Sequence, residues 1–253
     1  MLPVSVSAQL IVETESLNLE FSEQGDLLHV ESCFPECAAK RAKTRALSSR
    51  QGMLVFNQDS KQALHFEREH DGNATVLSFS DDTGRVSRRW QIPDQGWLIS
   101  VNVAGVEEAV LMSGEDFRPP ASSGFGYLLE QPRYLFFDGS SAETTGLDEA
   151  GQSSRMSAGW FGFRNRFWAV MVLAEQSLSA TPDAGESVVD ARIEIKPAGQ
   201  DQGFSMEIYL GPVEPAALSQ AASELEGLMY SGLWFWLRWI CQALYFLLNS
   251  IAA

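Results

Sequence analysis

Short apolar runs with a period of two dominate the first 210 residues of this chain. In the segment 97–103, the four residues Trp97, Ile99, Val101 and Val103 all fall on one face of an extended backbone. This alternation is typical of a β-strand with one face buried in a core. The pattern therefore predicts strands rather than helices over most of the chain.

Similar runs recur along the sequence, and turn-forming sequences such as Asp71-Gly72-Asn73 separate them. In the segment 86–92, Arg88 shares its face with Trp90 and Ile92. The segment 167–174 is apolar without interruption, which predicts a strand covered on both faces. Further strand-like runs are 17–21, 27–30, 53–56, 63–66, 76–79, 106–112 and 134–137. More than ten strands at this spacing predict a mainly β protein, a large antiparallel sandwich.

Two regions interrupt the β pattern. Residues 138–158 are rich in Ser, Gly, Thr and acids, which predicts a long exposed loop. After Gly211-Pro212 the apolar period becomes helical, and Pro215 suits a first helical turn. We therefore expect a helix over 215–229 that packs on the sandwich. Its apolar face consists of Leu218, Ala221, Ala222, Leu225 and Met229.

The segment 233–251 is apolar and aromatic, with Arg238 as its single charge. Arg238, Gln242, Tyr245 and Asn249 line one narrow stripe of a helix, which favours a helix lying along a membrane surface over one crossing it. The alternative is a hydrophobic helix packed on its own domain or on a partner subunit. The residues expected to contact a membrane are Trp234, Phe235, Trp236, Trp239, Leu244, Phe246 and Leu247.

The charge balance limits the classes of partner. The chain has 33 acidic and 18 basic residues, a formal charge of -15 over 253 residues. This charge repels nucleic acid and also anionic lipid, so any membrane contact must be hydrophobic. A local basic cluster is expected to lie in a solvated loop. It consists of Lys40, Arg41, Lys43, Arg45 and Arg50.

The cysteines leave two alternatives open. Cys33 and Cys37 are close enough in sequence to form a disulfide in an oxidising compartment, and they could equally remain free thiols. Cys241 lies within the terminal apolar segment. No secretory signal opens the chain, so either the protein is cytoplasmic or the segment that exports it is not part of this sequence.

The sequence offers no set of catalytic residues, no cofactor motif and no metal site. His65 and His70 fall on opposite faces of a strand and cannot share a metal directly, and His29 is isolated. Nucleophile elbows, phosphate loops and dinucleotide fingerprints are lacking. The acidic pairs at 81–82 and 107–108 are expected to be solvated charges. We therefore expect a protein that is not an enzyme.

Four pieces occur in a characteristic order. Residues 17–27 form an alternating strand with a glycine turn, 159–169 are GWFGFRNRFWA, 209–212 are YLGP, and 232–236 are GLWFW. Together they resemble the periplasmic domain of the YidC-type membrane protein insertases (YidC/Oxa/Alb family). The positions that match the family motifs are Gly159, Trp160, Phe167, Tyr209, Gly211 and Pro212.

The resemblance implies a β-supersandwich of the galactose-mutarotase type with C-terminal helices, on the periplasmic face of the bacterial inner membrane. It implies three parts: the sandwich (1–211), an amphipathic helix packed on it (212–230) and an interfacial or membrane-entry helix (231–253). It further implies a non-catalytic role in assisting the insertion or folding of membrane proteins. The implied partners are the lipid interface, and inserting proteins or subunits of a membrane complex such as the Sec translocon.

The sequence also departs from the family. Arg164 and Arg166 stand where uncharged residues are usual, and Ser231 stands where an acidic or aromatic residue is common. Family members also carry an N-terminal transmembrane anchor and five membrane spans with a hydrophilic groove, to which nothing here corresponds. Two alternatives therefore stay open. One is a stand-alone accessory subunit anchored by its C-terminal helix, and the other is a supersandwich module that binds carbohydrate or peptide.

Overall fold

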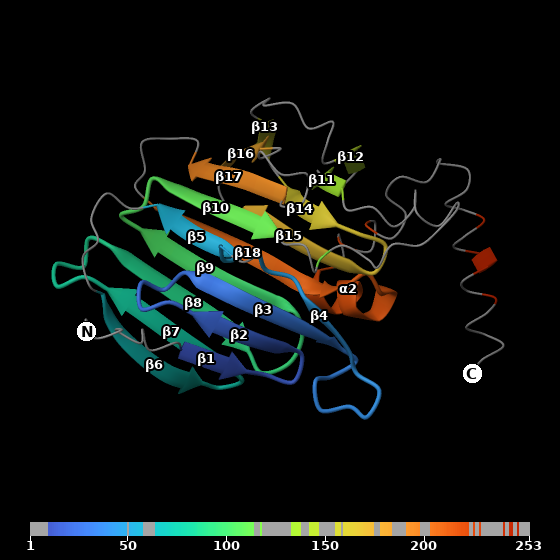
Figure 1. The fold of residues 1–253 in the computed structure, drawn as a ribbon, viewed down its shortest axis with the longest axis horizontal. Coiled ribbons are helices and arrows are strands. Elements are labelled where there is room, and N and C mark those ends of the chain that lie inside the picture. The colour runs from blue at the N-terminus through green and yellow to red at the C-terminus, as the bar shows by residue number, and fades with distance from the viewer. Residues whose placement is uncertain are drawn as a thin grey trace, which may run out of the picture.

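The computed structural model describes the chain over 10–49, 51–57, 64–113, 117, 133–137, 142–146, 155–157, 159–174, 178–183, 191–197 and 203–222, and at positions 225, 228, 240, 243, 244 and 247. These residues form eighteen strands and a short helix, α2 (Pro215–Ala221). All paired strands among them are antiparallel, in two nine-stranded sheets stacked face to face (Figure 1). The predicted antiparallel sandwich is confirmed.

The first sheet has the strand order β1-β2-β3-β5-β10-β17-β16-β13, with β4 paired to β3. Its strands are β1 (Leu10–Glu13), β2 (Leu17–Phe21), β3 (Leu27–Phe34), β4 (Lys43–Ala46), β5 (Leu54–Asn57), β10 (Glu108–Ser113), β13 (Arg155–Ser157), β16 (Leu178–Asp183) and β17 (Ala191–Pro197).

The second sheet has the order β12-β11-β14-β15-β18-β9-β8-β7-β6. Its strands are β6 (His65–Asp71), β7 (Ala74–Ser80), β8 (Ser87–Pro93), β9 (Leu98–Ala104), β11 (Arg133–Phe137), β12 (Ala142–Gly146), β14 (Trp160–Arg164), β15 (Trp168–Ala174) and β18 (Gly203–Pro212).

The core lies between the sheets because each central strand turns alternate apolar residues inward. On β9, Ile99, Val101 and Val103 are buried while Asn102 is exposed, as the sequence pattern predicts. The two sheets meet through aromatic contacts. The ring of Trp90 on β8 lies 5.1 Å from the ring of Phe21 on β2, in an edge-to-face arrangement.

A charged residue also lies inside this core. Arg88 is 1% exposed, and its Nη1 lies 2.8 Å from Oδ1 of Asp26 in the β2–β3 turn. The same nitrogen donates to the carbonyl of Gln24, and the guanidinium lies 4.7 Å from the centroid of the Phe56 ring. Burial lowers the pKa of Arg88, and the nearby Asp26 carboxylate opposes that shift. Arg88 therefore fastens a turn of the first sheet to the second sheet.

Several sequence-based expectations about local structure were wrong. The loop expected over 138–158 contains β12 and β13, and the basic segment expected to be a solvated loop contains β4. Asp81 is buried rather than solvated, because it accepts hydrogen bonds from the Thr83 hydroxyl and the Val86 amide across a turn. Glu108 is not simply solvated, since its carboxylate lies 2.8 Å from Nζ of Lys196.

The helix after Pro212 is shorter than expected. α2 ends at Ala221, and Ala222 has an extended backbone with φ -160° and ψ 135°. The expected apolar face nevertheless packs in part, since Leu218 and Leu225 are both buried. Met229 lies outside the described residues.

Candidate functional site

The pairing of β15 with β18 brings together two motifs that lie far apart in sequence. The first motif is 159–169, and the closing motif is 209–212. Trp168 pairs with Pro212 and Ala169 pairs with Gly211. The strand that follows the turn of the first motif thus runs beside the closing motif, at the end of the second sheet from which α2 departs (Figure 1). We take this end of the sandwich as the candidate site.

Tyr209 and Gly211 form a tightly packed corner at this end. The Tyr209 side chain is fully buried, and its hydroxyl donates to the Pro212 carbonyl at 2.6 Å. Burial raises the pKa of Tyr209, with a smaller contribution from Glu214. A Cβ on Gly211 would lie 2.7 Å from Cγ of Trp97 and from Cζ of Tyr209, so a larger residue does not fit without displacing these rings.

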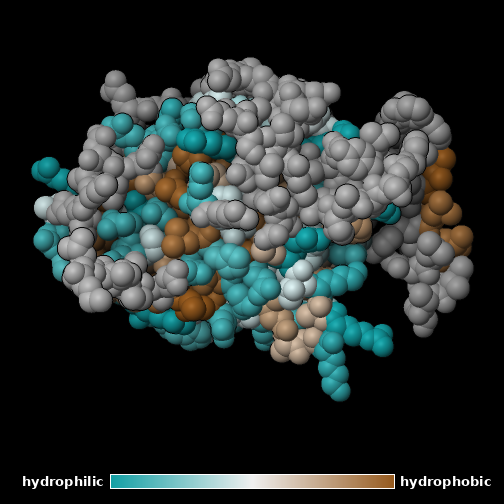
Figure 2. Space-filling model, viewed as in Figure 1, coloured by the Kyte–Doolittle hydropathy of each residue, from teal (hydrophilic) through white to brown (hydrophobic). Residues whose placement is uncertain are grey.

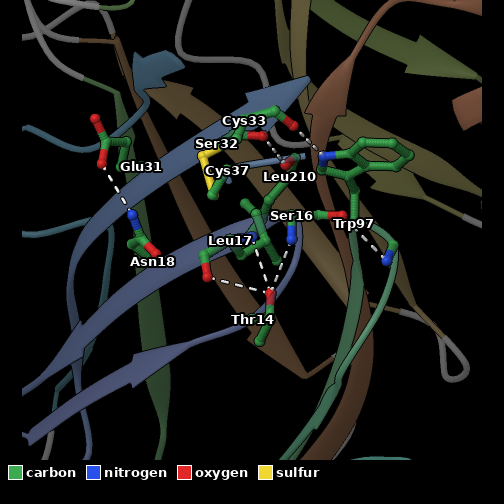
Figure 3. The surroundings of a disulfide bond; sticks show 11 residues. Thr14, Ser16, Leu17, Asn18, Glu31, Ser32, Cys33, Cys37, Trp97 and Leu210 are labelled. Carbon is green, nitrogen blue, oxygen red and sulfur yellow. Dashed lines mark hydrogen bonds between the residues drawn. A yellow bond between two sulfur atoms is a disulfide. The ribbon is translucent and has the colours of Figure 1, made fainter. Parts of the chain in front are cut away.

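The same corner joins the two sheets (Figure 3). Trp97 donates through Nε1 to the Cys33 carbonyl at 3.0 Å, and the Ser32 hydroxyl donates to the Leu210 carbonyl at 2.8 Å. Cys33 and Cys37 form a disulfide, with their Cα atoms 4.9 Å apart, which decides between the two alternatives left open by the sequence. The corner is therefore fixed by contacts from both sheets.

The first motif places a rigid turn beside this corner. Asn165 is buried, and its Oδ1 accepts the amides of Phe167 at 2.7 Å and Trp168 at 2.8 Å. Its Nδ2 donates to the Phe117 carbonyl. Phe167 was expected inside a covered strand, but β15 begins at Trp168 and the Phe167 side chain is 47% exposed. The Asn165 turn therefore points this aromatic ring into solvent.

The two remaining motif residues flank the start of β14. Gly159 is half-buried and precedes the strand. Trp160 opens the strand and is 1% exposed. In the part of the chain that the structure describes, Nε1 of Trp160 has no hydrogen-bond partner. Trp160 therefore packs in the core, and neither residue presents a reactive group.

The chain beyond α2 is fastened to the first motif. Leu225 and Leu228 are fully buried, and Arg164 at the end of β14 donates to the Leu228 carbonyl. Burial lowers the pKa of Arg164, and the neighbouring Arg133 lowers it further. The arginine that departs from the family pattern thus has a structural role.

Four described residues lie further along the C-terminal segment, at positions 240, 243, 244 and 247, and all four are helical and exposed. Their spacing of three and four places them on one face of a helix. Ile240, Leu244 and Leu247 on that face are 48%, 52% and 55% exposed. Hydrophobic atoms appear at the right-hand edge of Figure 2, on the side where Figure 1 draws the C-terminal residues beyond α2.

The comparison with known families decides the identity of this architecture. The sequence model of the YidC periplasmic domain matches residues 41–247. The chain belongs to the YidC periplasmic domain family. It is accordingly a YidC-type periplasmic domain, and membership places it on the periplasmic side of a membrane.

Other comparisons add less to this identification. No curated protein sequence matches the chain. A similar solved structure is the α-N-acetylgalactosaminidase NagBb from Bifidobacterium bifidum in complex with Gal-NHAc-DNJ, at 9% identity and a TM-score of 0.48. That alignment covers 80% of this chain and 36% of the glycosidase, so this chain spans about a third of that protein.

The structure describes some of the expected membrane-contacting residues of this YidC periplasmic domain. Leu244 and Leu247 share an exposed helical face, whereas Trp234, Phe235, Trp236, Trp239 and Phe246 lie outside the described residues. Within the described part of the chain, no helix is long and apolar enough to cross a bilayer. The membrane contact of this segment stays a prediction.

The described surface of the YidC periplasmic domain also has two grooves. One, of about 620 Å³, is acidic and lies beside the disulfide. The other, of about 380 Å³, crosses the outer face of β8, β9 and β18 and is lined by polar residues such as Arg89, Asn102 and Ser205. No group of three or more metal-ligating side chains occurs among the residues described. The geometry of these grooves does not assemble a nucleophile with a base.

Proposed function

We propose that this YidC periplasmic domain is a non-catalytic docking surface, held against the outer face of the inner membrane by its C-terminal apolar helix. In that position it assists the insertion or folding of membrane proteins. The observation that carries the proposal is the exposed helical face of Ile240, Leu244 and Leu247. Contiguous apolar surface of this kind marks a protein or membrane contact.

The attachment of this segment to the sandwich supports the proposal. The buried side chains of Leu225 and Leu228 and the hydrogen bond from Arg164 hold the chain on the sandwich after α2. Membrane binding by the apolar residues at 240–247 would therefore tether the sandwich to the bilayer through this attached segment.

The charge of the domain supports a hydrophobic mode of attachment. A formal charge of -15 is repelled by an anionic bilayer surface. Burying several large apolar side chains contributes roughly 1.5–3 kcal/mol each, which outweighs that repulsion. Added salt is therefore not expected to release the domain, in contrast to a polybasic anchor.

The docking role is tested by an insertion assay. A single-span membrane protein is diluted out of detergent into vesicles, and the protease-protected fraction is measured with and without the intact chain. We expect the chain to increase the inserted fraction and to decrease the aggregated fraction. An unrelated acidic β-sandwich serves as the control. Equal inserted fractions with the chain and with the control would contradict a docking role.

A further inference from the structure

We propose that the β14–β15 turn is a second membrane contact of this domain. In this proposal the Phe167 ring enters the lipid headgroup region, and the guanidinium groups of Arg166 and Arg133 bind lipid phosphates. The inference rests on the proposed function, since it requires the domain to lie at a bilayer. It adds an orientation, because a rigid body touching a surface at two places can no longer rotate freely about one helix.

The β14–β15 turn presents an aromatic ring on a fixed support. Phe167 is 47% exposed, although Asn165 and Trp168 beside it are buried. Asn165 accepts both the Phe167 and the Trp168 amides, and the Phe167 carbonyl accepts the Val213 amide at 2.7 Å. The ring is therefore exposed by a buried hydrogen-bond network and not by a loose loop. Aromatic side chains placed in this way suit the boundary between water and lipid.

Arginines are also concentrated around this turn. Arg133 on β11 pairs directly with Arg164 on β14, and Arg166 lies in the turn with its guanidinium carbon 5.4 Å from the centroid of the Phe167 ring. Three arginines thus gather at one end of a chain whose formal charge is -15. The Val213 amide donates to the Phe167 carbonyl, and the next residue, Glu214, brings an acidic side chain close to the turn. At a bilayer surface, the cation can bind the lipid phosphates while the neighbouring aromatic ring reaches the apolar layer beneath them.

The turn also contacts the start of the C-terminal segment. Arg164 closes β14 immediately before the turn and donates to the Leu228 carbonyl, in the segment that leads to the apolar helix. The Val213 amide binds the turn directly and lies just before α2. The turn and the start of the C-terminal segment are therefore parts of one structural unit. Because this segment is the one that we propose leads to the bilayer, the partner of the turn in this proposal is a lipid surface.

The domain contains a matched control for this chemistry. Phe66 on the edge strand β6 is 43% exposed, and Arg68 is also exposed on the same strand face. β6 lies at the far edge of the second sheet from β14, beyond β7, β8, β9, β18 and β15. Phe66 and Phe167 thus have similar exposure in solution, and only Phe167 adjoins the C-terminal segment.

Hydroxyl-radical footprinting of the intact chain tests the inference. Oxidation of each phenylalanine is measured in solution and on vesicles of mixed phosphatidylcholine and phosphatidylglycerol, after flotation has established that the chain is bound. We expect oxidation of Phe167 to fall several-fold on vesicles while oxidation of Phe66 stays unchanged. Equal oxidation of Phe167 in both states, in a chain that floats, would overturn the inference and leave the proposed function standing. A chain that fails to float would overturn both.

A pair of double variants supplies a second measurement. Phe167→Ser with Arg166→Gln is expected to weaken vesicle partitioning about tenfold, because the ring loses its apolar burial. Phe66→Ser with Arg68→Gln should partition like the unmodified chain. Both sites are exposed, so circular dichroism should show both variants folded. Equal partitioning of the two variants would count against the turn as a contact.

Discussion

Replacing Asp26 with Ala is expected to lower the free energy of unfolding by about 3–5 kcal/mol, because it leaves the Arg88 guanidinium buried without its counter-ion. Arg88 is 1% exposed, and its Nε and Nη2 already lack hydrogen-bond partners among the described residues. The Asp26 carboxylate also accepts the Phe56 amide at 3.0 Å, so the substitution removes a second bond. Chemical denaturation of the variant measures the loss.

The mechanism of this effect is checked by removing the cation as well. In the Asp26→Ala background, Arg88→Met replaces a buried charge with an apolar side chain of similar length and should restore much of the lost stability. Arg89→Met, on the exposed face of the same strand, should change stability little in either background. If Arg88→Met destabilised the Asp26→Ala variant further, the Arg88 side chain would stabilise the core by its packing even without a counter-ion.

Replacing Leu225 with Asp is expected to cost at least about 3 kcal/mol, because it removes a buried apolar side chain and places a carboxylate in its position. Leu225 is fully buried although it lies beyond the end of α2. The Leu228 carbonyl that Arg164 binds lies three residues further on, so the same variant should loosen the connection to the apolar helix.

Ser219→Asp provides the matched control for the Leu225 variant. It adds the same charge on α2, at an exposed position, and should change the melting temperature little. A Leu225→Asp variant that melts at the same temperature as this control would mean that the segment after α2 is not packed on the sandwich.

The strands were predictable because burial on one face leaves a period of two in the sequence. The segment around Trp97 shows this pattern, and Arg88 was already placed on the apolar face of its strand. β12 and β13 gave no such signal, since both lie at sheet edges, where backbone pairing with one neighbour suffices and the side chains need not be apolar. The sequence showed that Cys33 and Cys37 could form a disulfide, but only the structure shows that they do.

The candidate site was harder to predict because its contacts join distant parts of the chain. The sequence identified Tyr209, Gly211 and Pro212 through a family resemblance, but not the packing of Trp97 on that corner. The apolar run from 167 gave no sign of a turn, since hydrophobicity does not show that the Asn165 side chain accepts the Phe167 and Trp168 amides, or that the Phe167 ring is exposed. Arg164 stood out only as a departure from the family, and its bond to a carbonyl 64 residues away leaves no local pattern.

The helical period after Pro215 predicted which residues are buried better than it predicted the backbone. Leu218 and Leu225 are both buried as expected, yet α2 ends between them. An apolar spacing indicates which side chains face the sandwich. A segment whose helix is interrupted can bury the same side chains as a continuous helix does. The end of a helix is set by local backbone conformation, here the extended Ala222.

We propose that the C-terminal apolar helix holds this domain at a membrane. Vesicle flotation of the intact chain and of a chain ending at Ser231 tests this proposal most directly. The intact chain should float at both low and high salt, and the shortened chain should remain at the bottom while keeping its β-rich circular dichroism spectrum. Replacing Trp234, Trp236 and Trp239 together with Ser should weaken flotation more than Arg238→Gln does. Equal flotation of the intact and shortened chains would contradict the claim.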